Sequence, residues 1–165
     1  MSSIDIALII IVLLGAYGGY RDGFLMTLFS LLAIILGVLG GFKLMGKAML
    51  LLAEKFNVDA TVLPYISFFV VFILIVIIVT ALGRLVRSSI DGNFLGQVDQ
   101  ILGGLLGIVK IIFMTSVILW ILDSMKVDLP ERWTENSWLY PKVALFAPKV
   151  TSIIGKFVPA FKDIF

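Results

Sequence analysis

The sequence predicts an all-α integral membrane protein, a four-helix transmembrane bundle followed by a C-terminal amphipathic, interfacial helical segment. Of its 165 residues 61% are hydrophobic, and the mean hydropathy is +1.14. Soluble domains contain about 45–50% apolar residues, so this chain lies outside their range. The excess is concentrated in four runs, residues 4–20, 24–42, 62–83 and 101–122. We therefore expect a transmembrane domain over residues 1–125 and a polar link with an interfacial tail over residues 126–165.

The first run contains a single charge, Asp5. Each run holds roughly 17–22 residues, which at about 1.5 Å per residue spans a hydrocarbon core of about 30 Å. No Lys or Arg precedes the first run, so we expect a retained helix and not a cleaved signal peptide. The short link Tyr20-Arg21-Asp22-Gly23 predicts that the first two helices are antiparallel neighbours.

The second link, residues 43–61, is partly apolar and suits either a short surface helix or an extension of the second helix. Pro64 stands near the start of the third run, where its missing N–H costs little. The third link contains Asp91-Gly92-Asn93, which is a turn signal.

Small residues recur at four-residue spacing on three of the runs, and this spacing lets helix backbones approach closely in lipid. They are Gly15, Gly19 and Gly23; Gly37 and Gly41; and Gly103 and Gly107. The third run lacks the pattern. We therefore expect the first, second and fourth helices to pack tightly, and the third to expose more surface to lipid or to another copy.

One face of the fourth helix combines charge with glycine. Asp99, Gly103, Gly107 and Lys110 stand at positions i, i+4, i+8 and i+11, within an arc of about 80° around a helix. We take this face as a candidate functional or packing site. Asp99 and Lys110 lie roughly 16 Å apart along the axis, too far to pair with each other.

Asp99 therefore needs a partner on another segment. Arg84 or Arg87 lies on the same side of the membrane and is the expected partner, with Arg21 as a second option. Gly23, at the turn after the first helix, completes the group of candidate residues.

Lys110 lies near the middle of the fourth run, where a charge costs about 2.5–3.5 kcal/mol on insertion scales. Two interpretations stay open. Either Lys110 faces a polar cavity, pore or ion path, or residues 97–107 enter the membrane at an angle. The second arrangement brings Lys110 nearer to a surface or to a helix-end carbonyl.

The tail has an apolar stripe at three- and four-residue steps, as in an amphipathic helix. The stripe consists of Phe146, Val150, Ile153, Ile154, Phe157 and Phe161, and the interfacial residues are Trp138, Lys142, Lys149 and Lys156. Such a helix lies in the headgroup plane, although its apolar face also suits packing on the end of the bundle. We expect Pro141, Pro148 and Pro159 to divide it into pieces.

Composition also excludes several functions. The chain has no Cys and no His, so zinc and copper sites are not expected, and we predict no cofactor and no metal. A net charge of +2 with dispersed basic residues argues against nucleic acid as a partner. Without His, Cys or a GxSxG sequence, we predict no enzymatic activity.

The pattern Asp99-x-x-Leu-Gly-x-x-x-Gly-x-x-Lys110 resembles the colicin V production protein (CvpA) family. Ile4-Asp5, Gly23-Phe24 and Trp133-Thr-Glu-Asn-Ser137 add to the resemblance in order and spacing. The chain departs from the family's charges at Asp22, Met26, Thr27 and Gln100. The resemblance implies a four-span bacterial inner-membrane protein linked to colicin V production or export and to envelope integrity. It also implies cytoplasmic short links and external termini, which the basic residues of the links do not settle.

Two functions follow as expectations. The first is a non-enzymatic membrane scaffold that supports toxin production or export, or envelope homeostasis. The alternative is a small oligomeric channel or transporter whose polar path is lined by the fourth helix. The expected partners are the lipid bilayer, a second copy of the chain, and envelope or export proteins.

Overall fold

The computed structural model describes residues 3–56, 59–88, 96–126, 134 and 137–157, with the backbone alone for residues 3 and 155–157. Its helices are α1 (Ser3–Asp22), α2 (Phe24–Lys55), α3 (Leu63–Ser88), α4 (Gln97–Ser124), α6 (Tyr140–Ala144) and α7 (Phe146–Phe157). Among the described residues, four helices are long and apolar enough to cross a membrane. This confirms the expected fold class. The chain is a multi-pass helical membrane protein.

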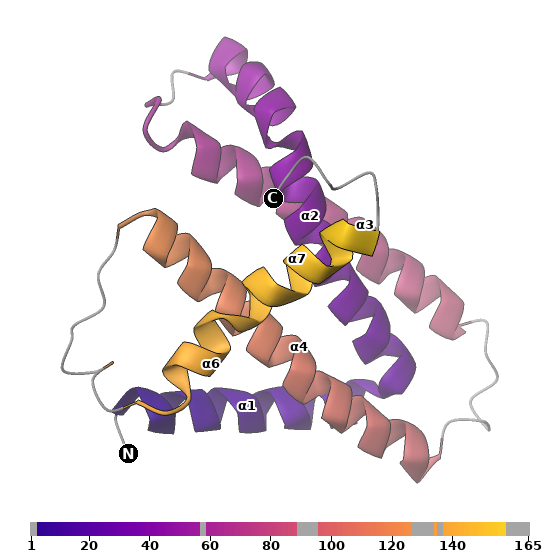
Figure 1. The fold of residues 1–165 in the computed structure, drawn as a ribbon. Coiled ribbons are helices and arrows are strands. Elements are labelled where there is room, and N and C mark those ends of the chain that lie inside the picture. Colours follow the sequence, from indigo (N-terminus) through magenta and orange to yellow (C-terminus); the bar gives the residue numbers. More distant parts are fainter. Residues whose placement is uncertain (1–2, 57–58, 89–95, 127–133, 135–136, 158–165) are drawn as a thin grey trace.

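The four long helices are arranged as two crossing pairs (Figure 1). α1 packs against α4, and α2 has its largest interface with α3. On α2, Gly37 and Gly41 leave space for side chains of α3: a Cβ at Gly37 would lie 2.8 Å from the Phe72 ring, and one at Gly41 would lie 2.7 Å from the Phe68 ring. The glycines expected to bring α2 against α1 and α4 thus also receive aromatic rings from α3.

α3 nevertheless exposes more apolar surface than the other long helices. Only 17% of its most apolar window is buried, compared with 39% for α2. Large side chains remain exposed along its length, including Ile73, Ile77 and Leu82. In a membrane protein such a face contacts lipid or another protein, as expected for this helix.

The segment after the second run extends helix α2 and does not form a separate surface helix. α2 continues to Lys55, and the N–H of Phe56 then donates to the Leu52 carbonyl at 2.8 Å. α3 begins after a turn at Asp59, whose carbonyl accepts from the N–H groups of Val62 and Leu63. Both ends of the link therefore use main-chain hydrogen bonds.

The core joins the bundle to the tail. Its buried members come from α2, α4 and α7, and they are Ile34, Val38, Phe113, Val117 and Ala147. Phe146 and Val150 of α7 pack against them. In Figure 1, α6 and α7 run across α4 toward α2. The tail therefore covers the bundle with its apolar face, and the headgroup position of its outer face stays a prediction.

Prolines divide the tail as expected, but they do so by starting helices. Pro141 stands at the beginning of α6, and Pro148 lies in the first turn of α7, where a missing N–H is tolerated. The break falls at Leu145. Pro159 lies outside the described residues.

Candidate functional site

The glycines of α1 and α4 bring the two backbones into direct contact. A Cβ at Gly19 would lie 2.7 Å from the Gly107 Cα atom, and one at Gly107 would lie 2.9 Å from the Gly19 Cα atom. Gly103 faces Gly23 in the same way, with the Gly23 Cα atom 2.8 Å from its would-be Cβ. No side chain fits between these helices at the crossing, so Gly103 and Gly107 act as packing surfaces against α1.

Asp99, in the first turn of α4, places its carboxylate against the N-terminal end of α2. Its Oδ1 atom accepts a hydrogen bond from the Phe24 N–H at 3.0 Å. Gly23, which precedes Phe24, has a φ angle of +79°, and a Cβ there would collide with the Asp99 carboxylate. A helix N-terminus carries a partial positive charge and unpaired N–H groups, so it is a favourable place for a carboxylate.

The arginines expected to pair with Asp99 make other contacts or none. Within the described residues, Asp99 forms no ion pair with Arg21, Arg84 or Arg87, and its hydrogen bond is to the main chain. Arg87 instead donates from Nη1 to the Asp22 carbonyl at 2.5 Å. Arg21 is exposed. The backbone of α2 thus takes the place that the sequence suggested for an arginine.

Lys110 is half-buried in the middle of α4. Its ammonium group forms no hydrogen bond or ion pair with any described residue, so it does not bond a helix-end carbonyl there. α4 is continuous from Gln97 to Ser124, and the angle at which residues 97–107 enter the membrane stays a prediction. The cation therefore stands on the helix face next to the glycine crossing without a described partner.

A second carboxylate, Asp5, links the start of α1 to the tail. Asp5 is 4% exposed, and its Oδ1 atom accepts from the Ser137 hydroxyl at 2.5 Å and from the Leu139 N–H at 3.2 Å. Ser137 in turn accepts from the Tyr140 N–H at 3.0 Å. Asp5 and Ser137 were noted in the sequence only as parts of the family resemblance and not as candidate site residues, although Asp5 is a lone acid at the start of an apolar run.

Ser116 fastens the tail to α4. Its hydroxyl donates to the Ala144 carbonyl at 3.1 Å and accepts from the Ala147 N–H at 2.8 Å. These two main-chain groups lie on either side of the break between α6 and α7. One fully buried side chain therefore satisfies a carbonyl from one helix and an N–H from the next.

The tail residues expected at an interface are largely exposed. Trp138 is 70% exposed, and the Lys142 Nζ atom lies 3.1 Å from the centre of its ring, a cation–π contact. Lys149 is also exposed, whereas the Lys156 side chain lies outside the described residues. The buried face of the tail consists of Val143, Ala147 and Thr151. Ile153, expected on the apolar stripe, is 54% exposed, so this part of the stripe does not pack on the described part of the bundle.

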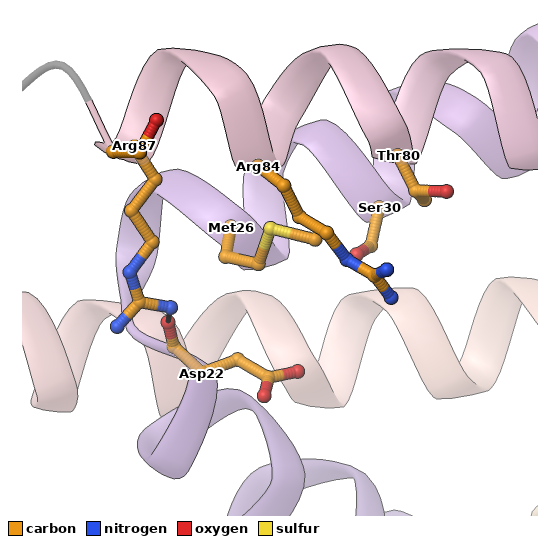
Figure 2. Close-up of a pocket in the computed structure, with 7 residues that line it drawn as sticks. Asp22, Met26, Ser30, Thr80, Arg84 and Arg87 are labelled. Carbon is orange, nitrogen blue, oxygen red and sulfur yellow. Dashed lines mark hydrogen bonds between the residues drawn. The ribbon is translucent and has the colours of Figure 1, made fainter.

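A polar cavity of about 650 Å³ lies at the end of the bundle where α1 ends and α3 ends. Its lining residues are Asp22, Met26, Ser30, Thr80, Arg84, Arg87 and Ser88. Figure 2 shows Arg87 reaching from α3 to Asp22 at the end of α1, and Arg84 extending from α3 below Ser30. Two of the candidate arginines thus share one cavity. Among the described residues, no group of three or more carboxylates forms a metal site.

A sequence model of the family described as Colicin V production protein matches residues 4–148. The matched segment contains both carboxylates that anchor other segments, Asp5 and Asp99, as well as the glycine crossing and Lys110. Residues of α7 after Pro148 lie beyond it. No curated protein and no solved structure matches the chain.

Proposed function

The chain belongs to the Colicin V production protein family, and on that premise we propose that it is a non-enzymatic scaffold of the bacterial inner membrane. In this role it supports toxin production or export, or envelope homeostasis, by holding envelope or export proteins together. Most of the described residues belong to the four helices that can cross the membrane, and the described part of the chain has no large domain outside them. Partners are then met mainly through helix faces and the tail.

One observation carries the proposal: the small and ionisable positions of α4 near Asp99 contact other helices. Gly103 and Gly107 touch the backbone of α1, and the Asp99 carboxylate binds the N-terminal end of α2. These contacts favour a rigid assembly over an open polar path along this face. A rigid core with an exposed apolar face on α3 suits a protein that presents surfaces to partners or to a second copy.

Gene deletion and complementation test the scaffold. In a bacterium that secretes a colicin V-type toxin, deletion is expected to lower secreted toxin activity or to raise envelope permeability. Complementation with the wild-type gene or with Gly18→Leu is expected to restore toxin secretion and normal permeability, because nothing lies within 4 Å of a Cβ at Gly18. Gly107→Leu forces α1 away from α4 and is therefore expected to restore neither toxin secretion nor normal permeability. A deletion that changes neither toxin secretion nor permeability contradicts the proposal.

A channel or transporter is the second candidate, and Lys110 is the observation that favours it. A half-buried cation in the middle of a spanning helix, with no described partner, is a feature of polar paths through membranes. Purified protein in liposomes distinguishes the two. The scaffold predicts no ion flux for wild type or Lys110→Leu, whereas flux in the wild type that Lys110→Leu abolishes establishes the channel instead.

A further inference from the structure

The polar cavity between α1, α2 and α3 contains more positive than negative charge. Arg84 and Arg87 contribute two guanidinium groups, and Asp22 contributes one carboxylate. Arg87 uses one N–H for the Asp22 carbonyl, which fixes its position and leaves its remaining donors available. Arg84 forms no hydrogen bond or ion pair with a described residue. The cavity therefore has a net charge of about +1 from these three residues and an unused planar donor group.

The hydroxyl groups of the cavity differ in what they can offer a ligand. Thr80 donates to the Val76 carbonyl at 2.6 Å, and Ser88 donates to the Leu85 carbonyl at 2.8 Å. Ser30 forms no hydrogen bond with a described residue, so its O–H is available. In Figure 2 its side chain lies near Arg84 and Thr80. The donors left over, two guanidinium groups and one hydroxyl, are suited to an oxyanion.

The depth of the cavity points to the headgroup layer. The apolar runs that end at Tyr20 and Gly83 are followed at once by cavity residues, Asp22 on one side and Arg84 on the other. The charged groups therefore stand where the hydrocarbon region ends. Basic pockets between transmembrane helices at this level bind phospholipid headgroups.

Apolar surface continues from the cavity along α3. Ile73 and Ile77 are 51% and 58% exposed, and they lie within about 60° of Thr80 and Arg84 around the helix. A ligand anchored at Arg84 thus has an exposed apolar row beside it, running into the bilayer. This arrangement fits a molecule with a charged head and an acyl chain, whereas a free anion has no apolar part that could contact the row.

We propose that this cavity binds the phosphate diester of a membrane phospholipid, with Arg84 and Arg87 donating to its non-bridging oxygens. Ser30 donates a further hydrogen bond. Asp22 keeps the net charge of the cavity near that needed for a monoanionic diester and disfavours a dianion. The acyl chain lies along Ile73 and Ile77. This lipid site does not depend on the scaffold role.

Native mass spectrometry of the full chain, purified in detergent and delipidated, tests the proposal. The probes are phosphatidylglycerol, diacylglycerol and inorganic phosphate. Wild type is expected to bind one phosphatidylglycerol, and Arg84→Gln is expected to weaken this binding by roughly tenfold or more, because a charge-assisted donor is lost. Arg21→Gln, at an exposed arginine on the same side of the membrane, is the matched control and leaves binding unchanged.

Three results overturn the proposal. Equal binding of diacylglycerol shows that the phosphate is not recognised, and equal losses in Arg21→Gln and Arg84→Gln show that attraction is unspecific. Inorganic phosphate that binds or competes as strongly as the lipid identifies a free anion as the ligand. Arg84 forms no hydrogen bond or ion pair with a described residue, so Arg84→Gln is the decisive variant; circular dichroism and size-exclusion chromatography check its fold.

A second measurement uses the wild-type protein alone, so it tests the site even if the Arg84→Gln variant fails to fold. Phenylglyoxal modifies accessible arginines, and peptide mass spectrometry locates the modification. Phosphatidylglycerol is expected to protect Arg84 and Arg87 but not Arg21, whereas diacylglycerol protects none of them. Modification of Arg84 at the same rate with and without phosphatidylglycerol contradicts the site.

Discussion

The Asp99 carboxylate accepts a hydrogen bond from the main-chain N–H of Phe24, although the two residues are 75 positions apart. Asp99 lies in the first turn of α4, and Phe24 is the first residue of α2. Gly23 lies between them with positive φ and without a side chain, which allows the carboxylate to reach the backbone. The contact therefore joins the two helical pairs of the bundle, because α4 packs on α1 while α2 packs on α3.

Replacing Asp99 should separate the contribution of its charge from that of its hydrogen bond. Asp99→Ala removes both and is expected to cost about 1–2 kcal/mol of unfolding free energy, as for the loss of a helix cap. Asp99→Asn keeps an acceptor and is expected to cost only about 0.3–1 kcal/mol, the share of the helix dipole. Unfolding in mixed micelles with rising SDS, followed by circular dichroism, measures both.

Asp123, exposed near the other end of α4, provides the control for this series. Asp123→Ala is expected to change the unfolding free energy by less than about 0.5 kcal/mol. An Asp99→Ala variant that unfolds at the wild-type SDS fraction shows that the carboxylate does not hold the end of α2.

The glycine crossing predicts opposite effects for neighbouring glycines. Gly19→Ala and Gly107→Ala place a methyl group against main-chain atoms and are expected to lose about 1–3 kcal/mol through overpacking. At Gly104 the nearest atom to a Cβ, the Ala16 oxygen, lies at an ordinary 3.4 Å, and at Gly18 nothing lies within 4 Å. Gly104→Ala and Gly18→Ala are therefore expected to leave stability unchanged or slightly higher.

The same SDS titration compares the four variants. Equal stability of Gly18→Ala and Gly107→Ala is the outcome that rules out close backbone contact between α1 and α4. If Gly104→Ala and Gly107→Ala both lower the unfolding free energy, α4 must be rotated so that Gly104 also contacts the backbone of α1.

Asp59 predicts a dependence of stability on pH outside the spanning segments. Hydrogen bonds from Thr61, first its main-chain N–H at 2.9 Å, lower the pKa of the Asp59 carboxyl below its ordinary value. A depressed folded-state pKa means that the stabilisation is present above the unfolded pKa of about 3.9 and is lost as pH falls through the folded pKa. Wild type is therefore expected to exceed Asp59→Ala in unfolding midpoint at pH 6, with the difference shrinking below pH 4. A difference that stays constant between pH 6 and pH 3 contradicts the shift.

The number and type of the long helices followed from the sequence because hydropathy sums over some twenty residues in each run. The partner of Asp99 did not. An arginine is visible in a sequence as a positive charge, whereas the positive end of α2 belongs to its main chain and depends on where that helix begins. Asp99, Gly103 and Gly107 were thus placed on the right face, and the nature of one contact was missed.

The pairing of α2 with α3 was missed for a related reason. Small residues spaced by four identify helices whose backbones touch, and α3 lacks that pattern in its apolar run. A ring packed into a notch requires glycine on one helix alone, as where Phe68 of α3 meets Gly41 of α2. Nothing in a single sequence states which helix supplies the ring.

Ser116 offers the sharpest test of how the tail is held. Ser116→Ala leaves the Ala144 carbonyl and the Ala147 N–H without their partner in a buried position, at an expected cost of about 1–3 kcal/mol. Since both groups belong to the tail, the loss should appear as faster hydrogen exchange and proteolysis in α6 and α7, with α1 to α4 unchanged. Ser124→Ala removes a hydroxyl that donates only within α4, to the Trp120 carbonyl, and is expected to leave the tail protected. Equal protection of the tail in both variants shows that apolar packing of Ala147 and its neighbours holds the tail without Ser116.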